Sequence, residues 1–146
     1  MILVDANILI YASIKSSSMH KEAKQWLDGC LNGEAPIGIP WESFLGFLRV
    51  ATNPRIFNPP VLPGDAWNVV EYWLDCEPVW IPQPTDKHRA ILDRLYSESA
   101  PQGNLVPDAH LAALAIEHGL ILCSTDSDFA KFNGLTWENP LTMKDT

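Results

Sequence analysis

Four acidic residues stand at the edges of segments that are otherwise apolar, an arrangement that suggests chemistry at a bound metal ion. Asp5 directly follows the aliphatic segment ILV, and Asp126 comes shortly after LILCS. Glu42 and Asp108 lie near the starts of the apolar segments WESFLGFLRVAT and PDAHLAALAIEHG. Carboxylates within about 4–6 Å of one another raise each other's pKa, and burial adds to the effect. No Lys or Arg accompanies these acids in the sequence, so a divalent cation is the natural partner if they converge.

The chemistry of these ligands favours Mg²⁺, with Mn²⁺ as the other possibility. All four groups offer hard carboxylate oxygens, and no His or Cys is expected to join them, which disfavours zinc. Mg²⁺ binds the phosphate oxygens of substrates, and a metal-activated water can attack phosphorus. A metal would also explain how a chain with a net charge of −8 could bind phosphate.

Each acid also has a structural interpretation. Asp108 could cap a helix, Glu42 could interact with a helix dipole, and Asp5 could be a turn residue. Asp128 is interpreted either as a further ligand or, preferably, as the cap of a short turn that begins at Phe129. One acid alone is therefore weak support for a metal site, and the combination carries the prediction.

Alternating strands and helices are expected to position the acids. Strands are predicted at residues 2–4, 36–40, 78–82 and 120–124 and near 135–137. Helices are predicted at residues 19–32, 41–52, 65–76, 85–98 and 108–118, with Asp65 and Thr85 as N-caps. This alternation predicts an α/β sandwich around a mostly parallel sheet. Ligands bind at the carboxyl ends of such strands, where Asp5 and Asp126 are expected.

Length and composition indicate one soluble globular domain over residues 1–146. The three cysteines, Cys30, Cys76 and Cys123, are far apart, which predicts neither a disulfide framework nor a zinc site. Buried free thiols fit a reducing, cytoplasmic location. The sequence also predicts no transmembrane helix and no signal peptide.

The sequence resembles the PIN-domain ribonucleases and, more closely, the VapC toxins of bacterial VapBC toxin–antitoxin pairs. The matching segments span nearly the whole chain: MILVDANILIYA, GIPWESFLGFLRVATNPRIF, GNLVPDAHLAALAIEHGLILCSTDSDF and GLTWENPL. The resemblance implies a PIN-like α/β fold, a three-layer α/β/α sandwich with a central, mostly parallel sheet. It also implies Mg²⁺- or Mn²⁺-dependent cleavage of single-stranded or looped RNA in the bacterial cytoplasm. It also implies a homodimer and a cognate VapB-like antitoxin that occludes the active site.

The resemblance further implies a role for each site residue. The expected catalytic and metal-binding residues are four acids, two that hold the metal directly or through water (Asp5, Asp108) and two that help to position or deprotonate the attacking water (Glu42, Asp126). Asn7 and Thr125 are expected to orient a carboxylate or a water, although Asn7 could instead be a helix cap. Asp128 matches a further acid of the family. Arg49, seven residues after Glu42, is a candidate phosphate contact.

Two other functions stay open at this point. One is a phosphatase of the D-x-D type, although Asn7 stands where its second acid would be. The other is a non-catalytic acidic module that binds a metal or a partner. A nucleotide-binding fold is disfavoured, because DANILIYA lacks the glycines of a phosphate-binding loop.

Overall fold

The computed structural model describes residues 1–142 and contains a five-stranded sheet in which every neighbouring pair of strands is parallel. The strands are β1 (Ile2–Val4), β2 (Ile37–Gly38), β3 (Val79–Trp80), β4 (Ile121–Cys123) and β5 (Trp137–Glu138). Their order, β3-β2-β1-β4-β5, places β1 in the centre of the sheet. Residues 143–146 of the predicted domain lie outside the described residues.

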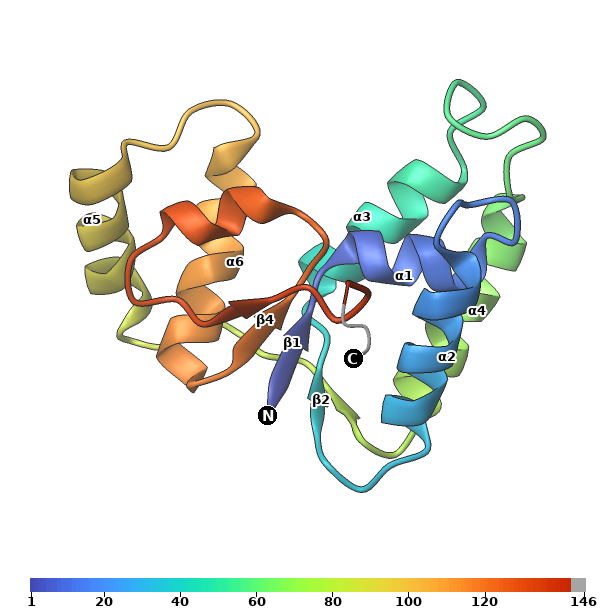
Figure 1. Cartoon of the computed structure of the whole chain (residues 1–146), viewed down its shortest axis with the longest axis horizontal. Helices are drawn as coiled ribbons and strands as arrows, with labels where there is room; N and C mark the ends of the chain where they lie inside the picture. Colours follow the sequence, from blue (N-terminus) through green and yellow to red (C-terminus); the bar gives the residue numbers. More distant parts are fainter. Residues whose placement is uncertain (143–146) are drawn as a thin grey trace.

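Helices cover both faces of this sheet (Figure 1). One face carries α1 (Ala6–Ser13), α2 (His20–Leu31), α3 (Trp41–Ala51) and α4 (Pro63–Asp75), and the other carries α5 (His88–Ser99), α6 (Leu105–His118) and the 3₁₀ helix η1 (Ser127–Lys131). The predicted α/β/α sandwich is therefore confirmed. No helix within residues 1–142 is both long and apolar enough to cross a bilayer.

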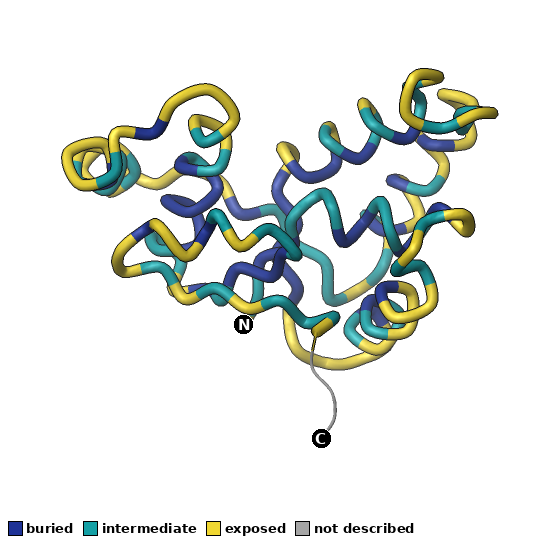
Figure 2. Tube along the Cα trace, turned by 45° about the horizontal axis from the view of Figure 1, so that its top comes forward, coloured by how far each residue is buried: buried dark blue, intermediate teal, exposed yellow. Residues whose placement is uncertain are grey.

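Two clusters of buried side chains hold the layers together. The cluster under α1–α4 includes Ile8, Leu27 and Phe47, and the cluster under α5 and α6 includes Leu95 and Leu114, all at most 1% exposed. Figure 2 shows buried backbone in the centre of the molecule and exposed backbone at its outer turns. Because both faces of the sheet are covered, short continuous apolar runs suffice as strands.

The sequence prediction missed α1, in which the apolar residues of ANILIYAS run almost continuously instead of at helical spacing. This helix buries both Ile8 and Leu9, so it has little polar face to produce a period. The predicted caps of two other helices are wrong. Asp65 lies inside α4, which begins at Pro63, and Thr85 precedes the observed start of α5.

Helix α6 begins at Leu105, three residues before the predicted start. Asp108 therefore lies within its first turn and is not its N-cap, a position that Asn104 occupies. The predicted end is confirmed, because Gly119 adopts a left-handed conformation (φ 67°) just past His118. The first turn of α6 thus carries Asp108 toward the carboxyl ends of the strands.

Close packing of α1 against α3 fixes the chain beside Asp5. A Cβ atom built on Gly46 of α3 would lie 2.9 Å from Cβ of Ala6, the first residue of α1. Real Cβ atoms essentially never approach so closely. Gly46 therefore lets the two helices meet directly beside Asp5.

Replacing Gly46 by Ala is expected to lower the free energy of unfolding by about 1–3 kcal/mol, because the added methyl group forces α1 away from α3. Gly29 in α2 is the matched control, since a Cβ there meets nothing within 4 Å. Gly29→Ala is expected to raise stability by about 0.5–1 kcal/mol through helix propensity and chain entropy. Urea unfolding checks both variants, and an equal effect of the two would contradict this packing.

Candidate active site

Neighbouring parallel strands bring Asp5 to the edge where the candidate site lies. Val4 pairs with Cys123, and the amide of Asp5 donates to the carbonyl of Cys123 at 3.0 Å. The Asp5 side chain then caps α1, since Oδ1 accepts from the amide of Ala6 at 2.7 Å. Asp5 is thus held by both its backbone and its side chain.

A buried hydroxyl group joins the two strand ends. Ser124, which is 0% exposed, donates from Oγ to Oδ2 of Asp5 at 2.7 Å. The same Oγ accepts from Nδ2 of Asn7 at 3.1 Å and from the amide of Asp126 at 3.0 Å. Ser124 therefore fixes the relative positions of Asp5 and Asp126.

The sequence predicted that Thr125 would orient a carboxylate or a water. In the structure, the hydroxyl group bonded to Asp5 belongs to Ser124, one residue earlier. Within residues 1–142 the Thr125 side chain makes no hydrogen bond, whereas Ser124 makes three. The sequence feature that could have indicated Ser124 is its position at the end of LILCS, directly after the apolar residues of the strand. Asn7 is bonded to Ser124 and lies inside α1, so its alternative role as a helix cap is wrong.

Asp126 occupies the capping position at the start of η1. Its Oδ1 accepts from the amide of Asp128 at 2.9 Å. The predicted cap of this turn by Asp128 is therefore wrong. Asp128 lies in the first turn of η1, and its half-exposed carboxylate is 3.5 Å from Nζ of Lys131.

Asp108 reaches the same edge from α6. Burial and then the negative charges of Asp5, Asp126 and Asp128 raise its pKa to about 6. The pKa of Asp5 is also raised, chiefly by burial and in part by Asp126, although bonds from Ser124 and Ala6 oppose the rise. The three aspartates therefore interact electrostatically, as the sequence suggested.

A cavity of about 470 Å³ contains the predicted site. It is lined by all four predicted acids and by residues of α1, α3, α6 and the segment before α6: Asp5, Ala6, Glu42, Ser43, Gly46, Arg49, Asn104, Val106, Pro107, Asp108, His110, Leu111 and Asp126. Arg49 is the one Arg or Lys among these described lining residues. Ser43 anchors the start of α3, because its buried Oγ donates to the carbonyl of Val4 at 2.6 Å.

Glu42 lines this cavity but is paired differently from the aspartates. Its Oε2 is bonded to Nε2 of His110, and this bond lowers the pKa of Glu42 and raises that of His110. The expectation that no His would join the acids is therefore wrong. The available signal was His110, two residues after Asp108, within a helix rich in Ala and Leu.

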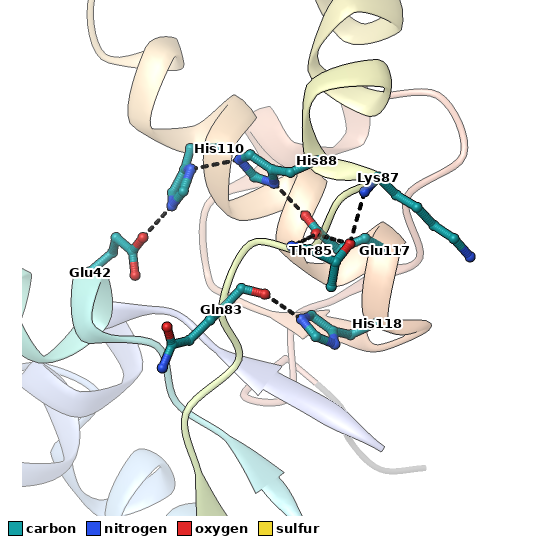
Figure 3. Close-up of polar contacts among 8 residues, drawn as sticks. All are labelled: Glu42, Gln83, Thr85, Lys87, His88, His110, Glu117 and His118. Carbon is teal, nitrogen blue, oxygen red and sulfur yellow. Dashed lines mark hydrogen bonds and ion pairs between the residues drawn. The ribbon is translucent and has the colours of Figure 1, made fainter.

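The polar contacts continue beyond His110 (Figure 3). His110 is bonded to His88, and His88 to Glu117, which also accepts from Thr85. The side chain of Glu117 is 0% exposed. Burial raises the pKa of Glu117, but the bonds from His88 and Thr85 outweigh this and lower it.

The donor set fits a hydrated, hard divalent cation. Within residues 1–142 no three His, Cys, Asp or Glu side chains are placed so as to enclose a metal by themselves. Mg²⁺ does not need such a cage, because it keeps several waters and uses one or two carboxylates. The buried Oδ1 of Asn7, two residues after Asp5, has no hydrogen-bond partner among the described residues, so an oxygen acceptor beside the acids is left unused.

Comparisons with known proteins agree on one family. The family described as "PIN domain" matches residues 2–135. Ribonuclease VapC37 of Mycobacterium tuberculosis is 41% identical over 138 residues, which cover 94% of this chain and 96% of the relative. Ribonuclease VapC33 of the same species is 35% identical and covers 97% of this chain and 99% of the relative.

Two solved structures share the fold. VapBC2 from Rickettsia felis, bound to a promoter DNA fragment, has a TM-score of 0.70 at 18% identity and covers 95% of this chain and 98% of its own. A toxin–antitoxin complex from Klebsiella pneumoniae has a TM-score of 0.64 at 20% identity and covers 96% and 98%.

Asp108→Asn is expected to raise the melting temperature in EDTA at pH 7.5 but not at pH 4. The native pKa of Asp108, about 6, lies above the ordinary 3.8, so ionisation disfavours the folded state. That penalty is absent below pH 4, grows between pH 4 and 6 and is constant above. Asp93→Asn, at an exposed position of α5, is the control. No gain at pH 7.5 for Asp108→Asn would contradict the raised pKa.

Ser124→Ala is expected to lower the free energy of unfolding by about 1–3 kcal/mol, because it leaves buried polar groups of Asn7, Asp5 and Asp126 without their partner. Thr125→Ala is expected to change stability by no more than about 0.5 kcal/mol. Urea unfolding at pH 7.5 measures both. Equal losses in the two variants would show that Ser124 has no special role.

Proposed function

The chain belongs to the PIN domain family, and we propose that it is a metal-dependent endoribonuclease that acts as the toxin of a toxin–antitoxin pair. The observation that carries this proposal is the convergence of the four predicted acids on one cavity at the carboxyl edge of a parallel sheet. The names of the relatives support RNA as the substrate, since VapC37 and VapC33 are both named ribonucleases and are similar to this chain over nearly their whole length.

The proposed metal is Mg²⁺, with Mn²⁺ as the alternative, held by Asp5, Asp108 and Asp126 directly or through water. When bound, such a cation polarises the phosphodiester and offsets the charge that develops during displacement at phosphorus. Burial and, to a smaller extent, neighbouring carboxylates raise the pKa of Asp5 and of Asp108, and a bound cation would offset both effects. Ser124 keeps Asp5 and Asp126 in place in spite of the repulsion between their carboxylates.

Glu42 is the proposed proton acceptor for the attacking water. Its lowered pKa keeps the carboxylate ionised at neutral pH. Oε2 is bonded to His110, while Oε1 receives no side-chain hydrogen bond from another described residue. The free oxygen can therefore accept a proton from a water in the cavity. Asn7 and Asp128 stay proposed as supporting residues at the edge of the site.

Arg49 is the proposed contact for the RNA backbone. It lies in α3 on the same cavity as Glu42, and its exposed guanidinium can bind a phosphate through two parallel hydrogen bonds. In a chain with a net charge of −8, one cation at the site matters more than overall charge for placing the substrate.

We also propose a VapB-like antitoxin that occludes this cavity, a homodimer, and a single domain for the whole chain. The titles of the solved structures with this fold, which name a VapBC protein and a toxin–antitoxin complex, support the antitoxin. Growth arrest on expression without an antitoxin would be its cellular consequence. The alternative functions are a phosphatase and a non-catalytic binding module, and the RNA-cleavage assay described below distinguishes both from a ribonuclease.

Purified protein is expected to cut single-stranded and hairpin RNA in Mg²⁺ or Mn²⁺ but not in EDTA. Asp5→Asn and Asp108→Asn are expected to lower the rate by about 100-fold or more, the loss typical when a charge-stabilising group is removed. Asn can still cap α1, so Asp5→Asn should stay folded. Asp93→Asn on the exposed face of α5 should cut like the wild type.

Three outcomes would contradict the proposal. RNA binding without cutting would indicate a non-catalytic module. Release of phosphate from small monoesters, with intact RNA, would indicate a phosphatase. Cutting that survives both EDTA and Asp5→Asn would place the activity outside this cavity.

A further inference from the structure

A chain of hydrogen bonds links the exposed carboxylate of Glu42 to a buried one. Nε2 of His110 contacts Oε2 of Glu42, and Nδ1 of His110 lies 3.1 Å from Nε2 of His88. Nδ1 of His88 contacts Oε2 of Glu117. Glu117 Oε1 then accepts from the amide of Thr85 at 2.6 Å and from its hydroxyl at 2.7 Å.

Burial increases along this chain in one direction. The exposed fraction of the side chain falls from 43% at Glu42 to 29% at His110, 13% at His88 and 0% at Glu117. The Glu117 carboxylate accepts three hydrogen bonds, so Glu117 is the more rigid end of this chain of contacts. Figure 3 shows the chain running from α3 across to α6 and on to the start of α5.

The donors in this chain are set by its two ends. An ionised carboxylate only accepts hydrogen bonds, so His110 donates from Nε2 to Glu42 and His88 donates from Nδ1 to Glu117. The contact between Nδ1 of His110 and Nε2 of His88 is then a hydrogen bond when one of the two rings also carries its second proton. Both rings are therefore fixed in orientation by the groups on either side. The rings also meet edge to face, with centroids 4.9 Å apart.

Glu42 needs such a support more than the aspartates do. Asp5 and Asp126 are short side chains whose oxygens are held by neighbouring donors. Glu42 is longer and about two-fifths exposed, and holding it in one rotamer costs conformational entropy. His110 is the described side chain that bonds it.

We propose that His110, anchored through His88 to Glu117, is a positioning residue that holds Glu42 in its reactive orientation. The inference rests on the proposed ribonuclease function, because it assigns Glu42 a part in the reaction. If the chain of bonds served only to join α3 to α6, its loss would lower stability without a selective effect on turnover.

Two substitutions at His110 separate these roles. Gln carries an amide N–H near the place of Nε2 and can still donate to Glu42, whereas the amide of Asn lies near the place of Nδ1 and cannot reach it. His110→Asn is expected to lower kcat for RNA cleavage by about 10- to 100-fold with KM changed by no more than about threefold, as for other supporting residues of active sites. His110→Gln is expected to restore most of the loss.

His118→Gln is the matched control. His118 also lies in α6 and bonds a neighbouring group, the carbonyl of Gln83 at 2.7 Å, but it is outside the chain that leads to Glu42. Its replacement is expected to leave kcat within about twofold of the wild type. Melting temperatures of all three variants show whether any loss of kcat follows from unfolding.

A spectroscopic measurement tests the bond without using activity. In ¹H–¹⁵N spectra of the histidine rings, the Nε2 proton of His110 is expected to be shifted downfield and to exchange slowly, and to lose both properties in Glu42→Ala. Equal kcat losses in His110→Gln and His110→Asn, or a similar loss in His118→Gln, would overturn the positioning role. So would an unbonded His110 proton in the wild type. If the wild type cuts no RNA while the proton is bonded, the ribonuclease function fails and the bond to Glu42 stands.

Discussion

The structure around the cavity depends on one electrostatic constraint: carboxylates are gathered where burial and mutual repulsion disfavour their ionised forms. Asp5 and Asp126 come to this place because β1 and β4 are parallel neighbours, and Asp108 because α6 begins beside them. Ser124 offsets part of the repulsion by bonding Asp5 and the backbone of Asp126. What remains appears as the raised pKa of Asp5 and Asp108, and a bound cation would relieve it.

Glu42 lines the same cavity but has a different electrostatic environment. Glu42 has a lowered pKa because His110 donates to it, whereas Asp108 has a raised pKa because of burial and its acidic neighbours. Environments that shift the pKa values of nearby carboxyl groups in opposite directions give those groups different chemical roles. The aspartates suit a cation, and Glu42 suits the acceptance of a proton.

Local sequence predicted an α/β sandwich with a mostly parallel sheet, because short aliphatic strands and periodic helices leave clear patterns, and the acids at the edges of these apolar segments stood out for the same reason. It missed α1, because a helix that buries most of its surface has little period to detect. It named Thr125 and missed Ser124, since only the pairing of β1 with β4 reveals which hydroxyl group is bonded to Asp5. The bonds from Glu42 to His110 and from His88 to Glu117 join residues 68 and 29 positions apart, and no local pattern predicts them.

The most direct test of the central claim is the anomalous scattering of crystals grown with Mn²⁺. We expect a peak in the cavity beside Asp108, within direct or water-mediated reach of the carboxylates of Asp5 and Asp126. In crystals of Asp108→Asn grown in the same way, the peak should weaken or vanish. Ordered side chains in the wild type with no peak among these three acids would contradict the account, as would a peak bound only elsewhere on the protein.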